Sequence, residues 1–304
     1  MTAFLRRRRL AHAVTAAIAA LALSSSAVAT SSASPSADCS GVRVPTPAIG
    51  FQLYGAREWI ADVGLEEVLA TLAEIGYQEV QPYAGSYSLP AEEFEALLRK
   101  YGLKASSGQY RYTDANFADF LKYAKAIGHR FVGSGGFGQP GIGSYEDTLA
   151  TAAQMNRLGE LSMRNGTGRL FGHNHAAEFQ TTYPDPVTGE LKTAWQILVE
   201  NTDPRWVTFE VDVFWSETAG VDTAALIERY GDRIELLHIK DGAIGTGTSG
   251  QTSVGEGTID WGPILEAAKG RVRYYVVEAD RVDWPEGPAV FAEESFDFLS
   301  CSGR

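Results

Sequence analysis

The stretch Arg233–Gly242, RIELLHIKDG, decides the fold. Its apolar run from Ile234 to Leu237 is too short for a helix, which favours a buried strand. His238, Lys240 and Asp241 follow at the end of this run. Polar side chains of these types are rarely buried without a partner, so their place at the end of a buried strand indicates a functional site.

The same pattern, an apolar run that ends in a residue type able to bind metal, recurs in three other stretches. VTFEVD ends at Asp212, YYVVE ends at Glu278, and RLFGHNH contains His173 and His175. Side chains two residues apart share one face of a strand, so His175 points the same way as His173 and lies nearer the mouth. Four strands therefore end in His173, Asp212, His238 and Glu278, and this set predicts a metal site.

Predicted strands and helices alternate along the whole chain. The expected strands are 48–54, 78–82, 103–109, 129–133, 170–175, 207–212, 233–238 and 272–278. The expected helices are 65–75, 89–101, 114–127, 145–165, 194–201, 222–230, 262–269 and 287–299. This alternation predicts a single-domain (β/α)8 TIM barrel of the α/β class, whose active site lies at the C-terminal ends of the strands. The predicted metal ligands lie at those ends.

The first residues predict an export signal. Four arginines, Arg6 to Arg9, precede an apolar segment from Leu10 to Leu23 and a small-residue cleavage pattern at 27–29. We expect residues 1–29 to be a cleaved signal peptide, 30–44 a disordered tether and 45–304 the barrel. The mature protein is therefore expected to be secreted.

The charge balance limits the expected partners. The formal net charge is −12, and removal of Arg6 to Arg9 makes it about −16. An acidic surface repels nucleic-acid phosphates and anionic lipid, so we expect neither nucleic acid nor a membrane as a partner. The sequence leaves the oligomeric state open.

The two cysteines, Cys39 and Cys301, lie near opposite ends of the chain. In an exported protein we expect a disulfide between them, because a closed barrel brings its two ends together.

Seven segments carry a resemblance to a known family, and they span nearly all of the predicted mature chain. They are FQLYGAR, GYQEV, FGHNHAAEF, FEVDVFWSETAGVD, RIELLHIKDG, VGEGTIDW and YYVVEAD. With these segments the chain resembles the xylose isomerase-like sugar isomerase/epimerase superfamily. The resemblance implies a divalent metal held by strands five to eight and a sugar or related polyol as substrate. By position, Asp212, His238 and Glu278 match the family's ligands on strands six, seven and eight.

Strand five departs from the commonest family pattern. Many members have a glutamate there, whereas this chain has His173, with His175 two residues later. We expect His173 to be the ligand, with His175 as the alternative. Epimerases of the family use the glutamates of strands five and eight as a facing acid/base pair. The resemblance therefore implies a catalytic role for Glu278, but the replacement on strand five argues against epimerisation by two bases.

The donor types indicate the metal and the chemistry. Two imidazoles and two carboxylates favour one Mn, Co, Zn or Fe ion over Mg or Ca, which prefer oxygen ligands. Such an ion would act as a Lewis acid on a keto sugar and stabilise an enediolate. His175 is the expected general base, because an imidazole titrates near neutral pH. Return of the proton to another carbon gives isomerisation, so we expect a metal-dependent sugar isomerase or epimerase. The alternative is a lyase, in which a β-substituent is lost, for example from a 3-keto-glycoside.

Other residues have two interpretations each. Lys240 is expected either to hold a substrate oxygen or to form a loop salt bridge. Glu210 shares a face with Asp212 but lies deeper, which favours a partner of a ligand over a ligand. The remaining candidates for contact with a sugar or its anionic group are Tyr54, Arg111, Trp215 and Trp261; packing is the alternative for the aromatic ones.

Two other classes of protein remain open. A secreted glycosidase without metal would use paired carboxylates such as Glu210 and Glu278, and a sugar-binding barrel would turn nothing over. The superfamily also contains metal-dependent abasic-site endonucleases, but the acidic composition and the export signal argue against that function. A free sugar or glycoside is the expected ligand.

Overall fold

The structure is a computed structural model that describes residues 41–86 and 88–301. The predicted signal peptide, most of the predicted tether and Cys39 lie outside these residues, so the export signal and the Cys39–Cys301 disulfide remain predictions. Val44 is buried, and its N–H donates to the Leu299 carbonyl over 2.9 Å. The packed chain therefore includes at least one residue before the predicted start at 45. None of the described helices is both long and apolar enough to cross a bilayer.

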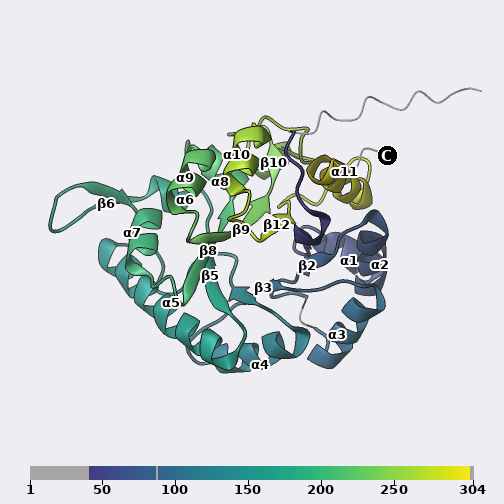
Figure 1. Cartoon of the computed structure of the whole chain (residues 1–304), viewed down its shortest axis with the longest axis horizontal. Helices are drawn as coiled ribbons and strands as arrows, with labels where there is room; N and C mark the ends of the chain where they lie inside the picture. Colours follow the sequence, from purple (N-terminus) through teal and green to yellow (C-terminus); the bar gives the residue numbers. More distant parts are fainter. Residues whose placement is uncertain (1–40, 87, 302–304) are drawn as a thin grey trace, which may run out of the picture. The chain divides into compact units, whose positions relative to one another are not determined.

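Within residues 41–86 and 88–301, eight parallel strands form the barrel (Figure 1). They are β1 (Ile49–Gln52), β2 (Glu79–Gln81), β3 (Ser107–Gln109), β4 (Phe131–Gly133), β5 (Arg169–His173), β8 (Val207–Asp212), β9 (Ile234–Ile239) and β12 (Tyr274–Val277). Their order around the sheet is β2-β1-β12-β9-β8-β5-β4-β3. A bridge between Glu79 and Lys104 joins the remaining edges, β2 and the segment before β3. The predicted (β/α)8 barrel is confirmed.

The helices that follow the strands form an outer layer around the barrel (Figure 1). They are α2 (Leu65–Ile75), α3 (Ala91–Lys100), α4 (Phe117–Ile127), α5 (Tyr145–Asn165), α7 (Ala194–Asn201), α9 (Thr223–Tyr230), α10 (Trp261–Ala268) and α11 (Pro288–Ser300). Side-chain caps fix the residue at which two of these helices begin. Ser144 accepts a hydrogen bond from the Asp147 N–H at the start of α5, and Thr193 forms a capping box with Gln196 at the start of α7.

The C-terminal ends of the strands carry further short elements that the sequence analysis did not predict. They are α1 (Arg57–Val63), α6 (Ala177–Gln180), β6 (Thr182–Pro184), β7 (Leu191–Thr193), α8 (Val213–Thr218), β10 (Asp241–Gly242), η2 (Gly247–Gly250) and β11 (Gln251–Thr252); the 3-10 helix η1 (Thr46–Ala48) precedes β1. The hairpin β6–β7 projects from the barrel beside α7 (Figure 1).

The inside of the barrel is divided into an apolar and a polar level. Phe131, Phe171 and Leu236 point inward on β4, β5 and β9 and form one buried cluster. Because side chains alternate along a strand, the inward positions two residues later are Gly133, His173 and His238. A Cβ at Gly133 would lie 2.5 Å from the Phe171 ring, so only glycine fits there. The apolar plug therefore closes the barrel beneath the histidines.

His129 lies just before β4, at the opposite end of the barrel from these histidines, and is buried. Its Nδ1 hydrogen-bonds to the Ala105 carbonyl. Burial lowers the pKa of His129 to about 4, although this hydrogen bond opposes the shift. The ordinary value of about 6.5 applies to the unfolded chain.

We therefore expect His129 to destabilise the protein in acid. The unfolded chain binds the proton more readily between pH 6.5 and 4, so the free energy of unfolding falls as the pH is lowered through this window. The loss from this one group should reach about 3 kcal/mol by pH 4. Urea unfolding of wild type and His129→Gln between pH 4 and 8 measures it. A stability difference between the two proteins that does not change with pH would contradict the assignment.

Candidate metal centre and substrate cavity

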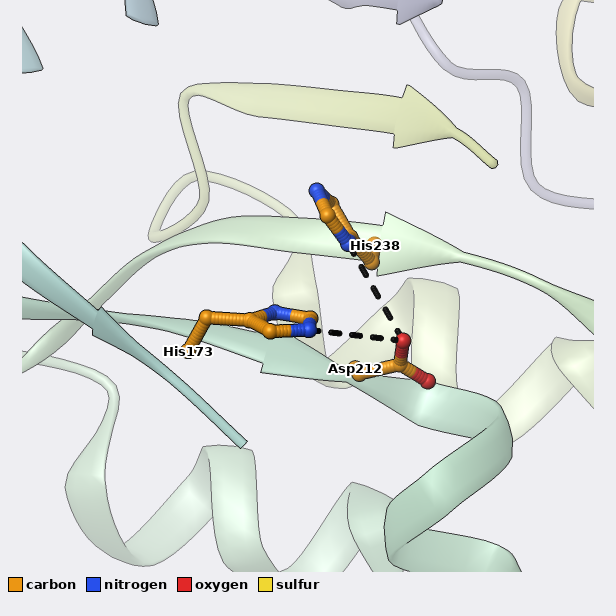
Figure 2. Close-up of side chains that lie close together, drawn as sticks. All are labelled: His173, Asp212 and His238. Atoms are coloured by element: carbon orange, nitrogen blue, oxygen red, sulfur yellow. Dashed lines mark ion pairs between the residues drawn. The ribbon is translucent and has the colours of Figure 1, made fainter. Parts of the chain in front are cut away.

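Three of the predicted ligands meet inside the mouth of the barrel. His173 ends β5, Asp212 ends β8 and His238 lies on β9, and each is almost completely buried. Their donor atoms all lie within 4.8 Å of one another. Figure 2 shows both imidazole rings directed toward the same oxygen of Asp212, Oδ2, which is 3.9 Å from His173 Nε2 and 3.9 Å from His238 Nδ1.

Glu278, the fourth predicted ligand, lies directly after β12 and beside the same group. Its Oε2 is 3.0 Å from His238 Nδ1. The buried ammonium of Lys240 faces the same two carboxylates, 2.9 Å from Asp212 Oδ2 and 2.7 Å from Glu278 Oε2. Two imidazoles and two carboxylates, the side chains that bind transition metals in proteins, therefore converge on one buried point.

The geometry of the cluster suits a transition-metal ion. Ligand atoms about 2.0–2.2 Å from a zinc-like ion lie roughly 3–4 Å apart, as these donors do. The donor set of two imidazoles and two carboxylates fits Zn, Mn, Co or Fe better than Mg. The residues present therefore fit a divalent metal.

His175 lies outside this cluster. Its ring centre is 5.0 Å from that of His173 and 5.9 Å from that of Trp215. Glu178 Oε2 accepts the His175 backbone N–H over 2.8 Å and thereby holds the turn after β5. Of the two histidines, the structure thus places His173 with the ligands and leaves the His175 ring at the wall of a cavity.

Lys240 lies beside the ligands and is completely buried. Its Nζ is 2.7 Å from Glu278 Oε2, 2.9 Å from Asp212 Oδ2 and 2.9 Å from Asp280 Oδ2. Burial opposes its charge, but these carboxylates outweigh burial and hold the pKa of Lys240 well above its usual value. Of the two predicted interpretations, the structure favours the ion pair.

The protonation states of the two histidines differ. Burial lowers the pKa of His173 well below its ordinary value, and the nearby His238 adds to the effect. Burial alone would also lower the pKa of His238, but the carboxylates of Glu210 and Glu278 outweigh it and raise the pKa to about 10. In the metal-free protein, His173 is therefore neutral and His238 carries a proton that metal must displace.

A layer of amides that was not predicted from the sequence lies beneath the candidate ligands. Gln52, Gln81 and Gln109 are the last residues of β1, β2 and β3, and all three are buried. Gln81 and Gln109 donate to the carboxylate of Glu210 over 2.6 and 3.0 Å. The signal was available in the sequence, because each glutamine ends its strand just as the metal-type residues end theirs.

A cavity of about 510 Å³ opens beside the cluster, over β1 to β5 and β12. His173, His175 and Glu278 form its wall on the metal side, and Tyr54 and Arg111 lie among the other lining residues. None of the ion pairs among the described residues involves Arg111, so its charge remains available to a ligand. The predicted positions of Tyr54 and Arg111 at the site are thus consistent with the structure.

The two predicted tryptophans lie elsewhere. Trp215 packs beside His175, and its ring centre is 5.9 Å from Lys240 Nζ, but it is not among the residues that line this cavity. Trp261 begins α10 and is only 2% exposed. Its indole N–H donates to Asp241 Oδ2 over 2.7 Å, which anchors the loop after β9. The prediction that Trp261 contacts substrate is therefore wrong.

Comparisons with known proteins agree with the fold. Residues 69–299 match the sequence model of a family described as xylose isomerase-like TIM barrel. Inosose dehydratase from Geobacillus thermodenitrificans is 28% identical over 162 residues, which are 48% of this chain and 51% of that protein. The chain thus matches about half the length of this relative.

Two solved structures share the barrel at low sequence identity. A sugar phosphate isomerase/epimerase from Parabacteroides distasonis superposes with a TM-score of 0.68 at 22% identity, covering 88% of this chain and 98% of that one. The IOLI protein, whose crystal structure has a bound zinc atom, superposes with a TM-score of 0.61 at 16% identity, covering 84% and 96%. These similarities concern the fold.

We expect the purified protein to bind one divalent metal per chain. Loss of a residue that only hydrogen-bonds a metal ligand lowers metal affinity roughly 10- to 100-fold. His173→Ala and His238→Ala each remove a proposed ligand, so they should lower metal affinity by more than that. His175→Ala should retain the metal, because that ring lies outside the cluster. Metal content by mass spectrometry and competition with a chelator measure this. Loss of metal in His175→Ala with retention in His173→Ala would reverse the assignment on β5.

Metal binding should also release about one proton. Because the pKa of His238 is about 10 without metal, the binding constant should rise about tenfold per pH unit between pH 6 and 9. Calorimetric titration in buffers with different ionisation enthalpies counts the released protons. A binding constant that is independent of pH over this range would contradict a protonated His238 in the metal-free protein.

Proposed function

The chain belongs to the xylose isomerase-like TIM-barrel family, and from this membership we propose that it is a divalent-metal-dependent enzyme acting on a keto sugar or sugar derivative through an enediolate. The observation that carries the proposal is the position of the donor cluster. His173 and Glu278 belong to the cluster and also line the cavity, so a ligand in the cavity can reach the metal position.

A divalent ion bound there would supply Lewis-acid chemistry toward a carbonyl oxygen and its neighbouring hydroxyl. The chain's own residues would do the rest. His175, on the cavity wall, would take the proton from the carbon next to the carbonyl, as a general base must lie within hydrogen-bond reach of the proton it removes. The released electron pair forms the carbon–carbon double bond of the enediolate.

Lys240 would act through the carboxylates. Its ammonium contacts Asp212 and Glu278 together and thereby keeps both oxygens directed into the centre. Arg111 and Tyr54, which also line the cavity, would position the remainder of the substrate. We propose this positioning role for Lys240 in place of a direct contact with a substrate oxygen, because its side chain is buried beneath the cavity wall.

Two outcomes are open to the enediolate. Protonation at the former carbonyl carbon by the conjugate acid of His175 gives an isomer. Expulsion of a substituent on the next carbon, which leaves with that same proton as water or an alcohol, gives an unsaturated ketone. One observation favours this elimination, because a relative is named a dehydratase. The histidine on β5 argues only against epimerisation by two bases.

The metal-free glycosidase alternative has less support. It needs Glu210 and Glu278 as a pair that reaches the glycosidic bond from both sides. Glu210 is completely buried, accepts two side-chain amide hydrogen bonds and is not among the residues lining the cavity. A carboxylate in that position has no access to a substrate.

We expect chelator-sensitive turnover on a panel of an inosose, keto hexoses and 3-keto-glycosides. NMR in deuterated water should show deuterium at a carbon next to the carbonyl, and His175→Ala should lower kcat by about 100- to 10,000-fold with unchanged metal content. His129→Gln, a histidine change at the other end of the barrel, is the matched control. Turnover that is insensitive to chelation would contradict the proposal, and the product separates isomerase from lyase.

A further inference from the structure

We infer that Glu210 is a positioning residue shared by both histidine ligands, and that it makes His173 and His238 bind metal through different ring nitrogens, Nε2 and Nδ1. The inference rests on the proposed metal centre. It concerns the residues that hold the ligands, and it starts from the contacts of one buried carboxylate.

The carboxylate of Glu210 lies beneath both rings. Its Oε2 is 3.2 Å from His238 Nε2 and 3.7 Å from His173 Nδ1. The opposite nitrogens, His238 Nδ1 and His173 Nε2, are each 3.9 Å from Asp212 Oδ2. Each imidazole therefore lies between two carboxylates, with Glu210 on one side and the metal position on the other.

The orientation of the Gln81 amide determines the proton on His238. Gln81 Nε2 donates to Glu210 Oε1 over 2.6 Å and to Ser107 Oγ over 2.9 Å, so Gln81 Oε1 is the atom 2.8 Å from His238 Nε2. The Gln52 amide also donates to this oxygen. Nε2 of His238 thus faces only acceptors, Gln81 Oε1 and Glu210 Oε2, and must carry a proton. A neutral His238 therefore has its lone pair on Nδ1.

His173 presents the other nitrogen to the metal. Its Nδ1 faces Glu210 at 3.7 Å, which is longer than a hydrogen bond but favours a proton on that nitrogen electrostatically. The strand register explains the difference, because His173 pairs with Glu210 whereas His238 pairs with Asp212, two residues farther along β8. The same two carboxylates therefore meet different edges of the two rings.

The hydrogen bonds from Gln81 and Gln109 mean that glutamine cannot replace Glu210 without disturbing its partners. Glu210 accepts from Gln81 at Oε1 and from Gln109 at Oε2. In Glu210→Gln, one of these oxygens becomes an NH2 group, and either choice sets a donor against a donor. Rotation of the Gln81 amide to relieve this would turn its own NH2 group toward His238 Nε2, which favours the tautomer that cannot bind metal through Nδ1.

The first test identifies the coordinating nitrogens directly. In protein labelled with 15N-histidine and loaded with 113Cd, we expect scalar coupling of cadmium to His238 Nδ1 and to His173 Nε2. Coupling through the same type of nitrogen in both histidines would overturn the inference. This readout requires neither substrate nor turnover.

The second test uses Glu210→Gln against Glu79→Gln. Glu79 is another buried glutamate of the barrel. It accepts two hydrogen bonds of 2.9 Å from Ser106 and is not part of the proposed centre. Glu210→Gln should weaken Cd and Zn binding about 10- to 100-fold and shift the 15N signals of both histidines, whereas Glu79→Gln should do neither. Unchanged affinity and signals in folded Glu210→Gln would also overturn the inference.

The outcomes separate this inference from the proposed function. If the wild-type protein binds no metal, the metal centre itself is wrong and the inference fails with it. If wild type binds metal with the expected couplings but turns over no sugar in the panel, only the proposed function fails. If turnover is metal-dependent and the couplings contradict the assignment, only the inference fails.

Discussion

Buried negative charge in the barrel mouth is the constraint on which the rest of the site depends. Among the described residues, Asp212, Glu278 and Asp280 gather there around one ammonium group, that of Lys240, and Glu210 lies 3.2 Å from His238 Nε2. Charges that are removed from water are costly unless opposite charges and hydrogen bonds compensate for them. Without metal, a proton on His238 supplies part of this compensation, and a divalent ion would supply more.

Because side chains alternate along a strand, the same short strands supply both an apolar level and a polar level inside the barrel. One inward level is apolar and contains Phe171 and Leu236, while the level above it contains His173 and His238. The plug closes the barrel from below, so the polar level can exchange with solvent only through its mouth. A low-dielectric floor strengthens every charge interaction above it. The fold provides this environment, and the chemistry depends on the particular side chains that end the strands.

The centre and the cavity are offset from each other. The proposed ligands come from β5, β8, β9 and the end of β12, whereas the cavity extends over β1 to β5 and β12 and meets the proposed centre at His173 and Glu278. A ligand in the cavity can therefore reach His173 and Glu278 beside the proposed centre as well as Tyr54 and Arg111. Loops after the early strands can change in sequence to select substrates without disturbing the ligands, because they belong to other strands.

The sequence by itself determined the barrel and which candidate ligands end its strands, because both depend on local periodicity. An apolar run that ends in a polar residue identifies a strand and its C-terminal end, and the barrel then brings those ends together. The tertiary structure alone decided the partners across the barrel. Gln81 and Glu210 are 129 positions apart, and Trp261 faces Asp241 in place of the cavity. Such pairings depend on strand register and loop paths, which set distances between residues that no local sequence pattern connects.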